Sequence, residues 1–463
     1  MPTTANNGST PPLPTTVSGA CAQLAIEQRA GNQPQEVLHA AKRCVIDWFA
    51  ATFPGSVDKP AKALESGLTD EIGHGGAYTL SGLKAPMRTA ALINGIASHS
   101  VEFDDIFAPA IYHPGSPVIA AALASAQGLN CSGRDFLNAV IAGYEVSTRI
   151  GECMGPDHYR FWHNTGTIGT IGATSAVAML HCLDSSRMQH AISTCVTMAA
   201  GLQAAFRGNS DIKPLHAGHA ADAAHIAVAL ARGGVLAPAD IFESDVGFGA
   251  AMAGHVDWST ILAPDQSYNI TRMSVKNHGC CGHIFPALDG ALALQDRHGF
   301  AASDIDSIAV GGYSATVNVT GNQIADTPGA AKFCLPFIVA SGLVHGSIRL
   351  DAYSDARLSD PVVRQLMPRI SVQLDPEIDA LFPHQRAANV TITLNDGTVL
   401  HHLQPHRIGD SELPLSDQQL MEKYHELAAT VTDRPRAQQL LDRLWLLESA
   451  ADLGFVQGIL HGS

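Results

Sequence analysis

The sequence predicts a mainly α-helical protein with a large all-helical domain, formed by both ends of the chain, and a smaller α+β lid domain. Three observations support this. Helical patterns follow one another from Val17 to about residue 263. Short runs rich in β-branched residues begin after residue 268, and helical patterns return after Pro414. At 463 residues the chain also exceeds the size at which one hydrophobic core usually stops growing.

The first part of the helical domain is expected to span residues 17–267. Residues 36–52 place apolar side chains at the spacing of one helix face. Further helical patterns, rich in alanine and interrupted by glycine, cover residues 135–151, 165–183, 188–203 and 215–232. We find no convincing strand pattern before residue 268.

The α+β lid domain is expected over residues 268–405. β-branched runs predict strands at 269–275, 307–312, 370–374 and 389–394, and helical patterns separate them at 283–296, 331–346 and 360–367. Asn395-Asp396-Gly397-Thr398 predicts a hairpin turn.

The C-terminal segment, residues 406–463, is expected to rejoin the helical domain. Ser416 is the expected N-cap of a helix over residues 417–428, and a second helix is predicted at 434–447.

Composition limits the classes of function. The content of 46% hydrophobic and 15% charged residues is that of a folded globular protein. A net charge of -15 without any Lys/Arg-rich run argues against a nucleic-acid partner. The nine cysteines, an odd number scattered through apolar sequence, are typical of reduced thiols in a cytoplasmic protein. Residues 1–16 are polar and lack signal-peptide features, so we expect a disordered leader, and no apolar run is long enough for a membrane span.

A dense polar stretch, His99-Ser100-Val101-Glu102-Phe103-Asp104-Asp105, lies between two apolar helical patterns and is followed by His113. Carboxylates and histidines this close together shift one another's pKa values toward the working range of a general acid or base. A helix-capping loop is the alternative, because Ser116 and the aspartates are common cap residues.

Three further places gather groups suited to catalysis. His163 precedes a helix rich in small residues, whose N-terminus offers free N–H groups to an anion. Lys213 lies just before a proline that starts a helix, and Lys276 follows a predicted strand and precedes Cys280-Cys281-Gly282-His283. Each has a structural alternative, a capping histidine or a lysine whose ammonium group reaches solvent.

The sequence contains no motif for a metal or a nucleotide cofactor. His216, His219 and His225 lack a carboxylate partner at the spacing of a zinc site. The glycine-rich segments match neither a P-loop nor a dinucleotide-binding fingerprint, and no G-x-S-x-G nucleophile motif is present. We therefore expect no cofactor.

Taken in order, these motifs resemble the MmgE/PrpD family, which includes 2-methylcitrate dehydratase, cis-aconitate decarboxylase and iminodisuccinate epimerase. The motifs are H-S-x-E-F-D-D, H-P-G-S, W-H-N-T-G-T-x-G, K-P-L-H-x-G-x-A-A, C-C-G-H after a strand-end lysine, and A-K-F-C-L-P-F. The resemblance implies a helical domain with an α+β lid, a homodimer, and metal-free chemistry on a small di- or tricarboxylate between the domains.

The resemblance also implies a set of site residues. The expected catalytic residues are His113, His163, Lys213 and Lys276, and the expected substrate-binding residues are Glu102, Asp104, Cys281 and His283. We expect His163 to be a neutral base, His113 an acid or anion clamp, and the two lysines to come from opposite domains. The chain departs from the decarboxylase at Cys281, where that enzyme has a histidine, and near Asn318, where its pocket tyrosine has no counterpart.

The expected function is that of a lyase, a hydro-lyase or a decarboxylase, which transfers a proton at the carbon next to a carboxylate. Two alternatives stay open: an epimerase or isomerase that uses the same proton chemistry, and a non-catalytic binding protein that has kept the fold.

Overall fold

The computed structural model describes residues 15–31, 33–206, 210–382 and 384–462. Nearly all of the predicted leader, residues 1–16, lies outside the described residues. Helix α1 begins at Val17, and the hydroxyl of Thr16 caps it by accepting the Gly19 N–H at 3.2 Å. The fold is mainly α-helical, as predicted.

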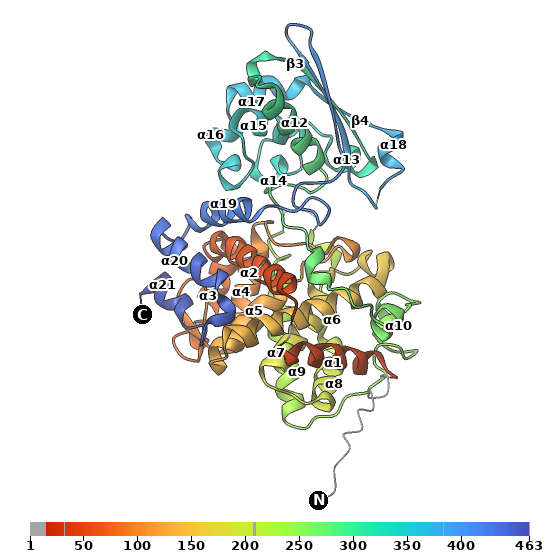
Figure 1. Cartoon of the computed structure of the whole chain (residues 1–463), viewed down its shortest axis with the longest axis vertical. Helices are drawn as coiled ribbons and strands as arrows, with labels where there is room; N and C mark the ends of the chain where they lie inside the picture. The colour runs from red at the N-terminus through yellow and green to blue at the C-terminus, as the bar shows by residue number, and fades with distance from the viewer. Residues whose placement is uncertain (1–14, 32, 207–209, 383, 463) are drawn as a thin grey trace, which may run out of the picture.

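Helices α1 to α11 and α19 to α21 lie in the lower part of the molecule in Figure 1. Their bounds are α1 Val17–Glu27, α2 Gln35–Ser56, α3 Lys59–Gly67, α4 Met87–Ser100, α5 Gly115–Leu129, α6 Gly133–Tyr159, α7 Asn164–Leu180, α8 Ser185–Cys195, α9 Leu215–Arg232, α10 Phe248–Met252, α11 Ser259–Leu262, α19 Asp417–Ala428, α20 Arg434–Trp445 and α21 Phe455–His461. The predicted cap of α19 is confirmed, because the Ser416 hydroxyl accepts the Gln419 N–H at 3.2 Å.

Small residues let the central helices approach one another closely. Every residue of α7 is buried, and α4 passes so near α9 that a Cβ atom on Gly95 would lie 2.8 Å from the Cα atom of Gly218. The apolar stripe predicted for α2 is also buried and packs against α4 and α19. Helices α4, α5, α7 and α9 pack together, and the loops at their ends carry most of the candidate site residues.

The main sheet lies in the upper part of Figure 1 with helices α12 to α18. Its strands are β3 Ile305–Gly312, β4 Ile370–Leu374, β5 Ala388–Leu394 and β6 Val399–Gln404, in the order β4-β3-β5-β6. Strands β3 and β4 are parallel and the other neighbours antiparallel. The helices are α12 Phe285–His298, α13 Ser314–Thr320, α14 Pro328–Ala331, α15 Leu335–His345, α16 Asp355–Leu358, α17 Pro361–Leu366 and α18 Pro376–Asp379.

Two strand predictions are wrong. Residues 269–275 do not form a strand: Asn269–Arg272 is a 3-10 helix, because the N–H groups of Asn269 and Ile270 donate to the Glu145 carboxylate at 3.1 and 2.9 Å. Two strands also lie before residue 268, namely β1 Ala77–Tyr78 and β2 Lys84–Ala85. Each has only two residues, too few to show the alternation by which a strand is recognised.

Buried hydrophobic residues of the described chain form two large clusters. The first contains residues from Val17 to Val275 and from Leu415 to Leu460, so both ends of the chain share it. The second runs from Cys280 to Leu400. The change from one cluster to the other occurs between Val275 and Cys280, where Lys276 lies.

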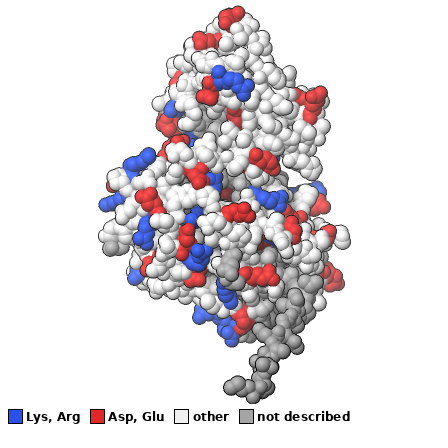
Figure 2. All heavy atoms as spheres, in the orientation of Figure 1, with Lys and Arg blue, Asp and Glu red and all other residues white. Residues whose placement is uncertain are grey.

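Charged groups of both signs are interspersed on the face of the molecule shown in Figure 2. Within the described residues, no helix combines the length and the hydropathy that crossing a membrane requires. The homodimer and the cytoplasmic location stay predictions.

A buried ion pair joins α19 to α2 and to the polar stretch. Lys423 donates to the Asp47 carboxylate at 2.5 Å and to the Phe103 carbonyl at 2.8 Å, and both charged side chains are fully buried. Burial lowers the pKa of Lys423 and raises that of Asp47, each against the attraction of its partner. The pair fixes a C-terminal helix to the loop that carries Asp104.

Asp105 is a second buried carboxyl group in this region. It accepts the Tyr144 hydroxyl at 2.7 Å and the Gly115 N–H at 3.0 Å. Burial raises its pKa to about 8, the nearby Asp47 carboxylate adds to that rise, and the hydrogen bond from Tyr144 opposes it. Gly115 is required here, since a Cβ atom at that position would lie 2.8 Å from Asp105 Oδ1.

We expect Lys423→Met to lower the free energy of unfolding by about 3–5 kcal/mol, because it leaves the buried Asp47 carboxylate without a counter-charge. Urea denaturation at neutral pH measures the change. The double variant Asp47→Leu/Lys423→Met should recover much of the loss, and Lys59→Met, which breaks an exposed ion pair with Asp211, should leave the midpoint unchanged. Equal stability of Lys423→Met and the wild type would contradict a structural role for the pair.

Asp105→Asn should change the pH dependence of stability. Between about pH 4 and the folded-state pKa of about 8, the folded wild type binds a proton at Asp105 that the unfolded chain has released. The free energy of unfolding of the wild type therefore falls as the pH rises through that window. The variant does not show this fall, because asparagine stays neutral. The urea midpoint of the variant, relative to that of the wild type, should therefore increase as the pH is raised across the window. Asp306→Asn, at an exposed position of β3, is the control, and its urea midpoint should depend on pH as that of the wild type does.

Candidate active site

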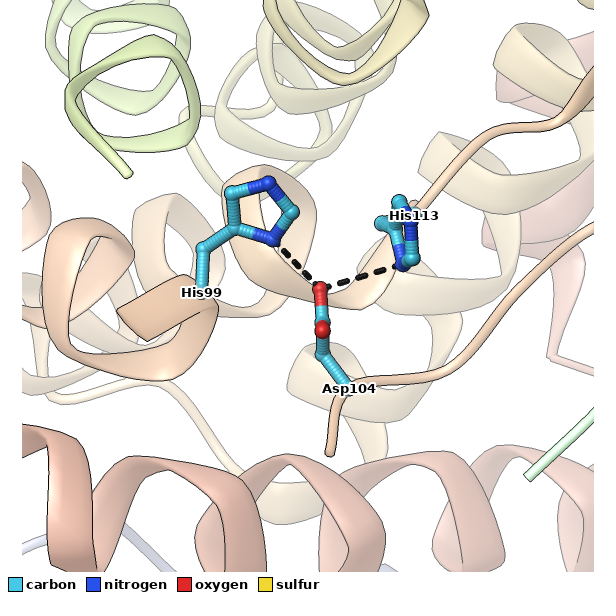
Figure 3. A group of neighbouring side chains, drawn as sticks. All are labelled: His99, Asp104 and His113. Carbon is cyan, nitrogen blue, oxygen red and sulfur yellow. Dashed lines mark hydrogen bonds and ion pairs between the residues drawn. The ribbon is translucent and has the colours of Figure 1, made fainter. Parts of the chain in front are cut away.

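The Asp104 carboxylate is the centre of the polar stretch (Figure 3). Its Oδ2 atom lies 2.6 Å from His99 Nδ1 and 3.2 Å from His113 Nδ1, and it accepts the Ser116 hydroxyl at 3.1 Å. Burial acts to raise the pKa of Asp104, but His113, His99 and Lys276 outweigh it and hold that pKa well below its ordinary value. Asp104 is therefore an ionised carboxylate that orients two histidines.

These contacts determine which nitrogen of each ring carries a proton. His99 Nδ1 faces only the Asp104 acceptor, and His113 Nδ1 also lies 2.8 Å from the Asp105 carbonyl oxygen, so both Nδ1 atoms are donors. The Nε2 atom of His99 is buried without a hydrogen-bond partner among the described residues. Burial lowers the pKa of His99 to about 4, although Asp104 opposes the shift.

Two lysines bind the same carboxylate, that of Glu102. Lys213, which precedes α9, contacts Oε1, and Lys276 contacts Oε2 at 3.3 Å and lies 3.8 Å from Asp104 Oδ1. Burial acts to raise the pKa of Glu102, but the two lysines outweigh it and lower that pKa well below its ordinary value. Glu102 keeps 37% of its side chain exposed and has a φ of 62°, a left-handed conformation that costs free energy for a residue other than glycine.

His163 lies at the N-cap of α7 and is almost fully buried. Its N–H donates to the Gly201 carbonyl at 2.8 Å, its ring stacks on that of His99 at 5.2 Å, and its Nδ1 atom lies 3.0 Å from His216 Nδ1. Burial lowers the pKa of His163 well below its ordinary value, and the charges of His99 and Lys213 lower it further. His163 is therefore neutral at physiological pH and can accept a proton.

The structure thus brings together six of the eight predicted site residues, namely Glu102, Asp104, His113, His163, Lys213 and Lys276. The two lysines do not form separate binding points on opposite sides of the site. Both ammonium groups contact the same Glu102 carboxylate.

Cys281 and His283 lie on the side of the second hydrophobic cluster. His283 Nδ1 contacts the Tyr313 hydroxyl at 2.9 Å, and Phe382 stacks on the Tyr313 ring. Burial lowers the pKa of His283 to about 4, and the nearby Arg386 adds to that shift. The Cys281 N–H donates to the Lys332 carbonyl at 2.9 Å, and burial raises the pKa of its thiol. The charges of Lys276 and Glu102 also act on that pKa, so the Cys281 thiol lies near these two residues. His283 therefore joins Tyr313 rather than the Asp104 group.

The structure adds three functional candidates to the predicted set. The sequence places His99 in the polar stretch without indicating a role for it, and suggests for His216 only the rejected metal site. Tyr313 supplies a phenol beside His283, five residues before Asn318. Tyr313 could have been identified from the sequence by its position directly after the strand β3, because side chains at the ends of strands often line functional sites.

His99, Asp104 and His113 place their ligand atoms within 4.8 Å of one another, as a metal ion would require. The surrounding charge does not fit a divalent cation, because Lys276 Nζ lies 3.8 Å from Asp104 and Asp104 already accepts three hydrogen bonds or ion pairs. His216 and His219 have separate partners, His163 Nδ1 and the Met198 carbonyl. The adjacent ammonium groups of Lys213 and Lys276 are instead suited to an anionic ligand.

Two family models match this chain. The MmgE/PrpD N-terminal domain matches residues 20–261, and the MmgE/PrpD C-terminal domain matches residues 278–447.

The decarboxylase relatives are similar over most of their length, and a dehydratase relative is similar over about a quarter of its length. The cis-aconitate decarboxylase-like protein oryM of Aspergillus oryzae is 26% identical, over 94% of this chain and 95% of its own. The cis-aconitate decarboxylase of Mus musculus is 24% identical, over 92% of this chain and 89% of its own. The 2-methylcitrate dehydratase of Cupriavidus necator is 34% identical over 24% of each chain. Because the two family models together cover most of its residues, the chain belongs to the MmgE/PrpD family.

Proposed function

We propose that the protein is a lyase that acts on a small di- or tricarboxylate by proton transfer at the carbon next to a carboxylate. The observation that carries the proposal is the pair of ammonium groups, Lys213 and Lys276, held on one carboxylate beside the neutral, buried His163. The full-length relatives named cis-aconitate decarboxylase favour decarboxylation, whereas the dehydratase relative matches only a quarter of the chain.

The lysines provide the anion-binding part of the proposed mechanism. Their contacts with the two oxygens of Glu102 are the contacts that a substrate carboxylate would make. When a proton leaves the neighbouring carbon, negative charge accumulates on that carboxylate, and ammonium groups already in place stabilise it without rearrangement. Lys276 is well suited to this role, because Glu102 and Asp104 raise its pKa against the effect of burial and keep it cationic.

The histidines provide the proton-transfer part. We assign His163 as the base, because its neutral imidazole lies among Lys213, His99 and His113. We assign His113, which is paired with the ionised Asp104, as the acid: in dehydration it protonates the hydroxyl that leaves as water, and in decarboxylation it protonates the carbon from which carbon dioxide has left. No step of this scheme requires a metal ion, and the alternative reaction, epimerisation, uses the same two groups without a leaving group.

The two hydrophobic clusters support a division into a helical domain and an α+β lid domain. We place the first boundary between Val275 and Cys280 rather than at residue 268, because Met273 and Val275 pack in the helical cluster. Lys276 then lies at the junction, and the ion pair of Arg349 with Glu426, at 2.6 Å, links the lid to α19. A substrate held by Lys276 would contact both domains and be shielded from water.

Incubation with cis-aconitate, citrate and succinate analogues in deuterated water tests the proposed reaction. Proton NMR should reveal a new alkene with loss of carbon dioxide for a decarboxylase, or loss of water for a hydro-lyase, and activity should survive treatment with EDTA. Deuterium uptake without loss of any group would establish the epimerase alternative. Binding of these acids without turnover or exchange would establish the non-catalytic alternative.

Substitutions should separate binding from chemistry. Lys213→Met should raise KM about 10- to 100-fold with a smaller change in kcat, because it removes one charge-assisted contact with the substrate. His163→Gln should lower kcat about 100- to 10,000-fold with little change in KM, because it removes the base. Lys84→Met, at an exposed position of β2, is the control. A wild-type kcat for His163→Gln would contradict the assignment of the base.

A further inference from the structure

The contact between His163 and His216 requires one shared proton. Their Nδ1 atoms lie 3.0 Å apart, the distance of a hydrogen bond, and an Nδ1···Nδ1 bond forms only when one ring donates and the other accepts. Two arrangements satisfy this. Either His163 carries its proton on Nδ1 and leaves Nε2 free as a base, or His216 donates and His163 carries its proton on Nε2, where it is an acid.

The space for His216 is created by two glycines. A Cβ atom on Gly201 would lie 3.1 Å from the His216 ring, and one on Gly166 would lie 3.1 Å from His216 Cβ. Gly201 has a φ of 142° and also accepts the His163 N–H, so the same residue positions both histidines. Phe206 closes the other side of the pair, with its ring 4.6 Å from that of His163.

His216 differs from His163 in exposure. His163 is buried, whereas His216, in the first turn of α9, is partly exposed. The titratable groups that act on His216 include His163, which contacts it, and Lys213 and His219, whose charges affect its pKa. Burial lowers the pKa of His216, and the charges of His219 and Lys213 lower it further, so a proton that reaches this ring is passed on rather than retained.

We propose that His216 is a positioning and proton-relay residue that acts through His163 and connects it to solvent. The inference rests on the proposed function, in which His163 exchanges a proton with the substrate. In this proposal, the hydrogen bond with His216 selects the tautomer of His163 and so determines whether His163 starts the reaction as a base or as an acid.

The relay can be written with every proton accounted for. His163 Nε2 takes the proton from the substrate carbon, and the electron pair of the broken C–H bond stays on the substrate. The Nδ1 proton of His163 then moves to His216 Nδ1, and His216 releases its own Nε2 proton to water. After these steps both rings are neutral, one proton has reached solvent, and the two tautomers are exchanged. The reverse sequence delivers a proton from water to the substrate carbon.

The tautomers can be measured without any substrate. In protein labelled with ¹⁵N-histidine, long-range NMR correlations distinguish Nδ1–H from Nε2–H, and His163→Gln and His216→Asn assign the two rings. We expect complementary tautomers, with one of the two rings protonated on Nδ1. Two rings that both carry their proton on Nε2 would overturn the proposal, because neither could then donate across the pair. This result does not depend on whether the protein has the proposed activity.

The kinetic test uses His216→Asn, whose amide can occupy the position of Nδ1 and keep a hydrogen bond to His163 but cannot transfer a proton. On whichever acid of the panel reacts fastest, we expect kcat to fall about 100-fold, the low end of what a positioned proton-transfer group contributes. KM should change little, and added imidazole should restore part of the rate. The control is His298→Gln, at an exposed position at the end of α12 and outside the candidate site, whose kcat should equal that of the wild type.

The outcomes separate the relay from simpler roles. A wild-type rate for His216→Asn would show that a hydrogen bond suffices and would overturn the relay. A rate loss that imidazole cannot restore, accompanied by a raised KM, would show that His216 only shapes the pocket and would also overturn it. If no acid of the panel reacts, the proposed function fails on that result, and the NMR measurement alone decides the inference.

Discussion

The buried carboxylate of Asp104 is the constraint on which the candidate site depends. An ionised group in the interior is costly unless charges and hydrogen bonds surround it. Here they come from the end of α4 through His99, from the first turn of α5 through Ser116, and from the segment after Val275 that carries Lys276. Displacing any of these elements would remove one of the partners of Asp104, so the electrostatics of one side chain hold three separate parts of the chain together.

The same buried charges affect the lysines and the histidines of the site differently. Carboxylates raise the pKa of Lys276 and keep it cationic, whereas burial and the charge of Lys213 lower the pKa values of His99 and His163 and keep both rings neutral. Neutral imidazoles beside fixed ammonium groups are suited to carry protons while the lysines bind negative charge. If the histidines were cationic instead, they would only add to anion binding, and no base would remain.

Much of the fold could be predicted from the sequence, because its signals are local. The apolar stripe of α2, the Ser416 cap and the Asn395–Thr398 turn each depend on neighbouring residues. The 3-10 helix at Asn269–Arg272 could not be predicted, since a carboxylate on α6 decides it. The site was predicted by its residue types and the family's motifs, whereas its pairings were not. His163 and His216 are 53 positions apart, and nothing local to either ring indicates that they share a proton.

Backbone strain near the site follows from the same arrangement. Glu102 and Ile111 both have positive φ values, 62° and 47°, which are unfavourable for a glutamate and more so for a β-branched isoleucine. The loop between them is held by Lys423 on the Phe103 carbonyl and by Tyr144 on Asp105, contacts made deep in the helical core. The strain therefore persists because buried contacts on either side offset it, and it turns Glu102 toward the two lysines. A relaxed loop would free Glu102 from that position, so the stability of the core and the geometry of Lys213 and Lys276 are set by the same few contacts.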